Sequence, residues 1–170
     1  GNDNGVVYNY EDVQSMSLPR LAATDYENGN LQPELAQSWE QSADYREATY
    51  HLRRDVHWSD GVPVTAEDVK FTLDLLNHPD VLVSNVDAVT VIDDYTVKVR
   101  RRAGAGPDQL AWVWHLPKHV LEHLDPKKFG QWDFWQRPTV SAGPYRFVRY
   151  VPETMMEFEA NPTDFRGKPK

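Results

Sequence analysis

The chain has 170 residues, of which 40% are hydrophobic and 12% aromatic. That composition can bury the core of one domain, or of one domain with part of another, and it excludes a disordered chain. The net charge of −8 disfavours nucleic acid as a partner, because phosphates are neutralised by a positive surface. The absence of cysteine excludes disulfide bonds and zinc–thiolate sites, and no window approaches the ~18 consecutive apolar residues of a membrane span.

The first thirty residues are polar and weakly patterned. We expect a short strand over residues 6–10 and a helical turn over residues 17–23. From residue 31 the pattern sharpens, and two strand-like runs, residues 35–40 and 48–53, flank a polar turn. In the second run Tyr50 lies between polar neighbours, which indicates a strand buried on one face. The two runs are therefore predicted to form an antiparallel hairpin.

The start of the next element carries the clearest local signal. Thr65 and Asp68 have the spacing of a capping box, in which each side chain bonds the backbone N–H of the other residue. Val64 before the cap and Val69 after it are placed as a hydrophobic staple. We therefore predict a helix over residues 66–77. Its buried face is expected to carry Val69, Leu73 and Leu76.

The remaining elements are short strands with short helices between them. The predicted ranges are strands at residues 86–92 and 95–101, a helix at 117–124 with Pro117 in its first position, a helical turn from residue 125, and strands at 145–151 and 155–160. The basic run at residues 100–102 is interpreted as a solvent-exposed strand edge. Antiparallel pairs with inserted helices indicate an α+β fold.

Several blocks of sequence stand out in chain order: residues 33–40 (PELAQSWE), 50–61 (YHLRRDVHWSDG), 62–69 (VPVTAEDV), 93–99 (DDYTVKV), 117–121 (PKHVL), 143–147 (GPYRF), 161–162 (NP) and 167–169 (GKP). Together they resemble the extracellular solute-binding proteins, family 5, which include the oligopeptide- and dipeptide-binding proteins. The run through residues 50–69 is the most specific, and its Asp60-Gly61 pair is a tight-turn signal because glycine tolerates φ > 0. The resemblance covers residues 31–170.

This resemblance implies a fold of two lobes that close around a ligand, with a further domain beside the first lobe. Residues 31–140 would form the additional α+β domain, and residues 141–170 would form a hairpin that returns to the first lobe. Residues 1–30 would be a poorly patterned segment before them, and the second lobe would lie outside this chain. The residues to which we assign structural roles are Trp39, Trp58, Asp60, Gly61, Thr65, Asp68, Gly143 and Pro144.

The resemblance also implies a function. The chain would be a fragment of an extracytoplasmic receptor that delivers peptides, or a similar small polar solute, to the membrane permease of an ABC importer. It would lie in the periplasm or at the cell surface on a lipid anchor, with the signal peptide outside this chain. Most ligand contacts would come from the two lobes, so the fragment would bind weakly or not at all on its own. Ser141 and Tyr145 are its candidate ligand-binding residues.

We expect no catalytic activity and no resident cofactor. The acidic pair at residues 67–68 is explained by the start of a helix, and the pair at residues 93–94 by a turn. Neither spacing brings an acid and a base together as catalysis requires. The serines lack the context of a nucleophile elbow, and no glycine-rich phosphate loop is present.

Three histidines could together form a metal-binding site. His115, His119 and His123 repeat every four residues, a spacing that places ligands on one face of a helix. Pro117 argues against one continuous helix through all three, and no carboxylate has the spacing of a zinc-protease motif. We therefore interpret His119 and His123 as surface residues of a helix and predict no metal.

Two features favour a stand-alone interaction or glycan-binding module as the alternative function. The tryptophans at 112, 114, 132 and 135 could line a sugar platform, although core packing is the more frequent role of such residues. The predicted hairpin at residues 145–160 carries several large apolar side chains. In an isolated chain they would lack a cover, and exposed apolar patches promote self-association.

Overall fold

The computed structural model describes residues 14–25, 27–81, 85–104 and 113–167. The chain divides into two compact units. The hairpin unit comprises Gly1–Leu18, Asp55–Val64 and Lys128–Lys170, and the sheet unit comprises Pro19–Arg54 and Thr65–Lys127. Antiparallel strands with inserted helices confirm the predicted α+β class. The domain limits inferred from the resemblance, 31–140 and 141–170, stay predictions.

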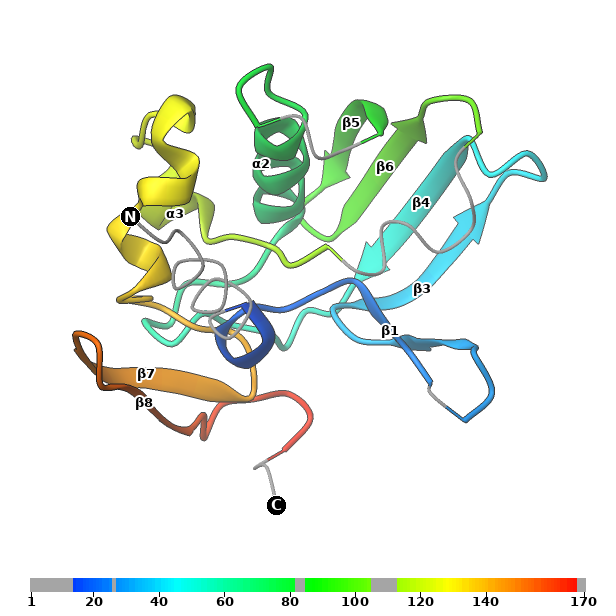
Figure 1. The fold of residues 1–170 in the computed structure, drawn as a ribbon. Helices are drawn as coiled ribbons and strands as arrows, with labels where there is room; N and C mark the ends of the chain where they lie inside the picture. The colour runs from blue at the N-terminus through cyan, green and yellow to red at the C-terminus, as the bar shows by residue number, and fades with distance from the viewer. Residues whose placement is uncertain (1–13, 26, 82–84, 105–112, 168–170) are drawn as a thin grey trace. The chain divides into compact units, whose positions relative to one another are not determined.

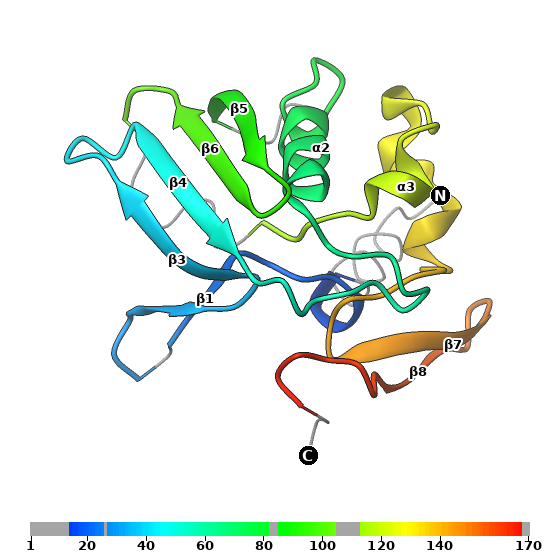
Figure 2. The same cartoon turned by 180° about the vertical axis from the view of Figure 1, so that it is seen from behind.

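Four strands of the sheet unit form an antiparallel sheet in the order β3-β4-β6-β5 (Figures 1 and 2). Their bounds are β3 Ala36–Gln41, β4 Glu47–Leu52, β5 Val86–Asp93 and β6 Thr96–Arg101. Both predicted hairpins are confirmed to within one residue at each end. Tyr50 in β4 is opposite Trp39 on one side and Val97 on the other. Because side chains alternate along each strand, these residues place one face of the sheet in the core.

The burial of Arg101 shows that the basic run at residues 100–102 is not a fully exposed strand edge, as the sequence had predicted. Val97, Val99 and Arg101 are all fully buried, because a strand places every second residue on the same face. Arg100 and Arg102 point the other way, and their Nε atoms lie 4.0 and 3.8 Å from carboxylate oxygens of Asp87. Burial raises the pKa of Tyr50 above its ordinary value, and the positive charge of Arg101 offsets part of that rise.

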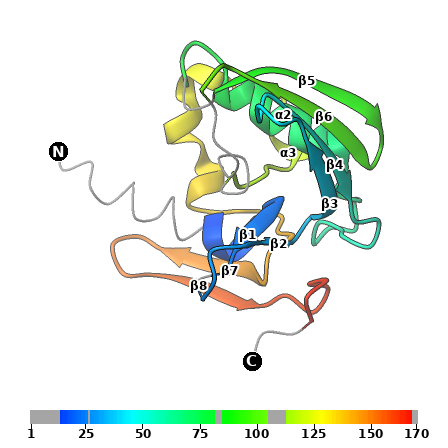
Figure 3. The ribbon, with the colours of Figure 1, turned by 90° about the vertical axis from the view of Figure 1, so that its right-hand side faces the viewer.

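The helix α2, Ala66–Leu76, packs on one face of the sheet against β5 and β6 (Figures 1 and 3). The Thr65 N–H donates to Asp68 Oδ2 at 2.9 Å, the carboxylate half of the predicted capping box. Val69 and Leu73 are fully buried, as the helical spacing predicts. Leu75 is buried and Leu76 only half-buried, which differs from the prediction because α2 also contacts the short helix α3, Lys118–Leu121, on a second side.

Asp68 joins α2 to a distant part of the sheet unit. Its Oδ1 accepts from the Lys118 N–H at 2.9 Å while its Oδ2 caps the helix. We expect Asp68→Ala to lower the free energy of unfolding by about 2 kcal/mol, because two backbone donors lose a charged acceptor. Urea denaturation measures this loss. The neighbouring Glu67→Ala is the control, since it removes only an exposed ion pair with Lys118 and should cost under about 1 kcal/mol. Equal effects of the two changes would contradict the assignment.

The beginning of the described chain differs from its prediction. Residues 14–17 are helical, and β1, Ala22–Thr24, follows and pairs antiparallel with β2, Leu31–Pro33. The helical turn predicted for residues 17–23 is therefore wrong. Pro19 gives the reason, because a proline restricts the residue before it to extended conformations and stops the helix. The strand predicted at residues 6–10 lies outside the described residues.

The helix predicted at residues 117–124 is shorter in the structure. The helix α3 is Lys118–Leu121, and Pro117 takes the extended N-cap position instead of the first helical position. The 3₁₀ helices η1, Pro126–Gln131, and η2, Asp133–Trp135, follow, which confirms the helical turn expected after residue 125. No helix in the described part of the chain is long and apolar enough to cross a membrane.

The hairpin unit holds the last predicted hairpin and an aromatic cluster. The strands β7, Tyr145–Val151, and β8, Met155–Ala160, pair antiparallel with the predicted limits. Trp132 and Trp135 are buried and stack with ring centres 6.5 Å apart. The Trp135 Nε1–H donates to the Phe129 carbonyl at 2.6 Å. These two tryptophans therefore belong to the core and are not a sugar platform, whereas Trp112 lies outside the described residues.

Candidate functional site

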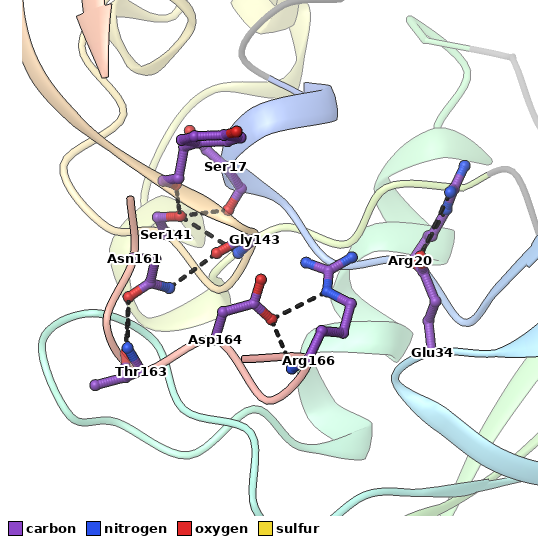
Figure 4. Close-up of polar contacts among 10 residues, drawn as sticks. Ser17, Arg20, Glu34, Ser141, Gly143, Asn161, Thr163, Asp164 and Arg166 are labelled. Carbon is purple, nitrogen blue, oxygen red and sulfur yellow. Dashed lines mark hydrogen bonds and ion pairs between the residues drawn. The ribbon is translucent and has the colours of Figure 1, made fainter. Parts of the chain in front are cut away.

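The chain around Ser141 crosses the helical turn at residues 14–17 at close range, within the hairpin unit (Figure 4). Ser141 Oγ lies 2.9 Å from the Ser17 carbonyl oxygen and 2.5 Å from the Tyr145 carbonyl oxygen, and its hydroxyl donates to these acceptors. The Ala142 and Gly143 N–H groups donate to the same Ser17 carbonyl at 2.9 and 3.0 Å. One carbonyl at the end of a helical turn therefore holds three consecutive residues.

Gly143 is the point of closest approach. A Cβ atom at this position would lie 2.6 Å from the Met16 carbonyl oxygen and 2.8 Å from the Ser17 carbonyl carbon. Both neighbours are backbone atoms, which cannot swing aside as a side chain would. The sequence motif places glycine here for the space that the crossing needs, not for an unusual φ.

Asn161 closes the other end of the β7–β8 hairpin onto the same crossing. Its Nδ2 donates to the Gly143 carbonyl at 2.8 Å, and its backbone N–H donates to the Pro144 carbonyl at 2.8 Å. Its Oδ1 accepts from the Thr163 N–H and hydroxyl at 3.2 and 2.9 Å (Figure 4). Asn161 is 2% exposed. We refer to Ser17, Ser141, Gly143 and Asn161 together as the crossing cluster.

The sequence singled out residues 161–162 only as part of a family block and assigned no role to Asn161. An asparagine at a strand end, followed by proline, was the available signal, because such residues bond nearby backbone groups. Asp164, three residues later, is buried too, and its Oδ1 accepts from the Arg166 N–H and Nε at 3.1 and 3.0 Å.

The two candidate ligand-binding residues lie side by side but differ in what they offer. Ser141 is 1% exposed and its hydroxyl is engaged with backbone carbonyls. Tyr145 begins β7 and is half-buried. Of the pair, only Tyr145 presents side-chain surface to a solute in this structure. Ligand contact by either residue stays a prediction.

The tight turn of the most specific sequence block also lies in the hairpin unit. Gly61 has φ +90°, the conformation for which the sequence predicts glycine. The Gly61 N–H donates to the Trp58 carbonyl, and the Asp60 side chain accepts from the Val62 N–H at 3.2 Å. Trp58 is 1% exposed, while Trp39 in the sheet unit is half-buried, 6.5 Å from the Tyr50 ring. The turn is joined to the crossing cluster, because the Ser59 N–H donates to the Ser141 carbonyl at 2.7 Å.

The three histidines considered as metal ligands differ in burial. His115 is fully buried, and burial lowers its pKa to about 3. His119 and His123 are exposed, so the three do not share one face. In the described ranges no three His, Cys, Asp or Glu side chains are grouped to hold a metal ion.

A partly buried ion pair in the sheet unit was not foreseen from the sequence. Arg20 Nε lies 3.0 Å and Nη2 3.4 Å from the two carboxylate oxygens of Glu34 (Figure 4). The guanidinium also lies over the Trp114 ring, 4.9 Å from its centre. A bidentate pair stacked on an aromatic ring fixes geometry, and we assign it a structural role. The two residues are fourteen positions apart in sequence, so no local spacing signalled the contact.

The comparisons agree on one family. The family model of the bacterial extracellular solute-binding proteins, family 5 Middle, matches residues 30–170. The periplasmic oligopeptide-binding protein OppA of Haemophilus influenzae is 30% identical over 181 residues, covering 89% of this chain and 32% of that protein.

Solved structures give the same result. NikZ from Campylobacter jejuni, in complex with Ni(L-His), superposes with a TM-score of 0.79 at 31% identity, covering 91% of this chain and 32% of that one. AppA from Bacillus subtilis, an oligopeptide-binding protein in complex with a nonapeptide, gives a TM-score of 0.85 at 24% identity over 94% of this chain and 33% of that one, which shows the fold alone. The chain spans 27% to 32% of the length of curated relatives that it matches.

Proposed function

Because the chain belongs to the bacterial extracellular solute-binding proteins, family 5, we propose that it is part of an extracytoplasmic receptor that binds peptides and delivers them to the permease of an ABC importer. The observation that carries the proposal is the family match through residues 30–170. The similarity to oligopeptide-binding OppA, at 30% identity over 89% of this chain, supports peptides as the solute. The receptor would work by closing two lobes around its ligand.

Within that receptor we assign this chain a supporting role. Its crossing cluster is built from hydrogen bonds between the chain's own groups, in which the buried side chains of Ser141 and Asn161 bond backbone partners. Such an arrangement holds the β7–β8 hairpin in place and performs no chemistry. We therefore infer a non-catalytic protein. Of the residues of this chain, the half-buried Tyr145 is our candidate for contact with the solute.

Calorimetric titration tests the proposal. The longer protein that carries this chain should bind peptides of two to nine residues and should gain about 2.7 kcal/mol of stability at a peptide concentration 100 times its Kd. The 170-residue chain alone should show neither heat nor stabilisation, because most contacts come from elsewhere. A nickel–histidine complex is the comparison ligand, since NikZ was solved with one. Binding of that complex but of no peptide would overturn the peptide assignment.

A pair of tyrosines on one strand tests the candidate contact. Tyr145 and Tyr150 are both half-buried in β7. In the longer protein we expect Tyr145→Ala to weaken peptide binding at least tenfold, about 1.4 kcal/mol, and Tyr150→Ala to leave it within twofold. Equal losses would mean that the tyrosines act only through the stability of the hairpin.

The alternative function, a stand-alone interaction module, rests on the same hairpin. Val148 and Met155 are 44% and 43% exposed, and exposed apolar side chains favour association. Light scattering of the 170-residue chain distinguishes the two cases. If the 170-residue chain is a monomer at high concentration, the interaction module is disfavoured. If the chain forms a defined dimer and the longer protein binds no peptide, the module is favoured.

A further inference from the structure

The turn between β1 and β2 carries an asparagine–glycine pair, Asn28-Gly29. Such a pair favours a tight turn, and Gly29 takes φ +73°, a conformation that suits glycine. Both residues are exposed. Asparagine is a thermally labile residue, and a following glycine has no side chain to obstruct its backbone nitrogen from reaching the asparagine amide. The pair is therefore a candidate for spontaneous deamidation.

Deamidation of this pair would begin with attack of the Gly29 backbone nitrogen on the side-chain carbonyl carbon, Cγ, of Asn28. The nitrogen gives up its proton and forms a bond to Cγ, the bond from Cγ to Nδ2 breaks, and Nδ2 leaves with that proton as ammonia. The resulting cyclic imide takes up water and opens to aspartate, or to isoaspartate, whose main chain runs through the former side chain. Water is the co-reactant, and nothing is oxidised or reduced.

Asp25 engages both reacting groups in the folded turn. The Gly29 N–H donates to the Asp25 carbonyl at 2.8 Å, which keeps the proton on that nitrogen and directs the N–H bond at Asp25. Asn28 Nδ2 donates to Asp25 Oδ2 at 2.8 Å, which fixes the side-chain amide. Both bonds must open before the nitrogen can attack, and local opening costs free energy. The folded turn therefore slows the reaction that its sequence favours.

Three more hydrogen bonds hold the same turn. Asp25 Oδ1 accepts from the Glu27 N–H at 2.8 Å, and the Asp25 N–H donates to the Asn30 carbonyl at 2.8 Å. The Asn30 N–H donates to Asn28 Oδ1 at 2.9 Å. This last bond polarises the amide carbonyl and by itself would favour attack, but it can do so only once the Gly29 nitrogen is released. Protection by Asp25 therefore decides the rate.

The product of the reaction would not fit the turn. A carboxylate at position 28 would replace the Nδ2 donor, which now lies 2.8 Å from Asp25 Oδ2, and two carboxylates at such a distance repel one another. Isoaspartate would also lengthen the main chain between β1 and β2, which are paired up to Thr24 and Leu31 beside the turn. Deamidation is therefore expected to open the turn and to keep it open.

We propose that Asn28 is a latent modification site. The hydrogen bonds of Asp25 protect Asn28 from deamidation in the folded chain, and opening of the β1–β2 turn releases it for conversion to aspartate and isoaspartate. Deamidated Asn28 then marks chains in which this turn has opened. The inference goes beyond the proposed transport function and does not rest on it, since Asp25, Asn28 and Gly29 all belong to the sheet unit.

Incubation of the 170-residue chain at mildly alkaline pH, with and without guanidinium chloride, tests the proposal. Tryptic cleavage after Arg20 and Arg46 places Asn28 in a different peptide from the asparagine–glycine pair at residues 4–5, and mass spectrometry follows its deamidation. We expect the rate to be at least about tenfold lower in the folded chain than in the unfolded chain, because hydrogen bonds must open first. Equal rates in the two conditions would overturn the proposal.

Matched variants test the role of Asp25. Asp25→Ala should speed deamidation of Asn28 in the folded chain at least about fivefold and leave the rate in guanidinium chloride unchanged. Asp44→Ala is the control, because Asp44 is also a turn aspartate whose carboxylate accepts from a backbone N–H, that of Arg46 at 3.1 Å. If Asp25→Ala deamidates no faster than Asp44→Ala, Asp25 does not protect the site.

A mimic of the product gives a readout that does not depend on the reaction rate. Asn28→Asp places a carboxylate opposite Asp25, and hydrogen exchange at the Gly29 N–H should become at least about fivefold faster because repulsion opens the turn. Asn30→Asp makes the same charge change, but Asn30 contributes its backbone N–H and carbonyl to the turn, so exchange should stay within about twofold. Equal exchange in the two variants would contradict the proposal.

Discussion

Replacing Gly143 by alanine should destabilise the protein by about 3 kcal/mol or more. The added methyl group would meet the Met16 carbonyl oxygen at 2.6 Å and the Ser17 carbonyl carbon at 2.8 Å, so the backbone itself must move. Overpacking of a well-packed site costs about 1–3 kcal/mol when side chains can adjust. Here a shift would also stretch the hydrogen bonds that the Ser17 carbonyl accepts from Ala142 and Gly143. Urea denaturation at neutral pH measures the loss.

The chain offers a matched control for this change. In the described part of the chain, no heavy atom lies within 4 Å of where a Cβ would be added to Gly130, and its φ is not in the left-handed region. Gly130→Ala should therefore be neutral, or stabilising by up to about 1 kcal/mol through a less flexible unfolded chain. If both alanine variants unfold at the same urea concentration, the crossing is not as tight as the structure shows.

The sequence predicted the strands and α2 well because their signals are local. The alternation around Tyr50 and the spacing of Thr65 and Asp68 each lie within one element, and period and cap chemistry decide their conformation. The same reasoning failed at residues 17–23, where Pro19 and the pairing of β1 with β2 overrode a weak helical pattern.

The contacts of the candidate site could not be predicted in the same way. Ser141 bonds the Ser17 carbonyl across 124 positions of sequence, and no spacing rule reaches that far. The prediction that Arg101 is exposed was wrong because it followed the charge of the side chain. The alternation with Val97 and Val99 already indicated that Arg101 lies on the buried face of the strand. Recognition of the family supplied the blocks, and only the structure showed that Asn161 and Gly143 bond one another.

Acid should destabilise the protein through His115. Its side chain is fully buried, neither ring nitrogen has a hydrogen-bond partner among the described residues, and burial lowers its pKa from 6.5 to about 3. At a pH between these two pKa values, His115 is protonated in the unfolded chain but neutral in the folded chain. The stability contribution of neutral His115 is thus complete above pH 6.5 and declines as pH falls, by up to about 1.4 kcal/mol per pH unit. By pH 4.5 the accumulated loss should be about 3 kcal/mol.

His115→Leu separates this effect from the titration of carboxylates. Leucine fills a similar space without a group to protonate, and it removes two buried polar atoms, so at pH 7 the variant should be as stable as the original or more so. Between pH 6.5 and 4.5 its free energy of unfolding, measured in urea, should fall by about 2 kcal/mol less than that of the original chain. The exposed His119, changed to glutamine, serves as the control and should keep the full dependence on pH. Parallel curves for the original chain and His115→Leu would show that His115 is protonated in the folded state, which a fully buried ring could not tolerate unless a partner compensated its charge.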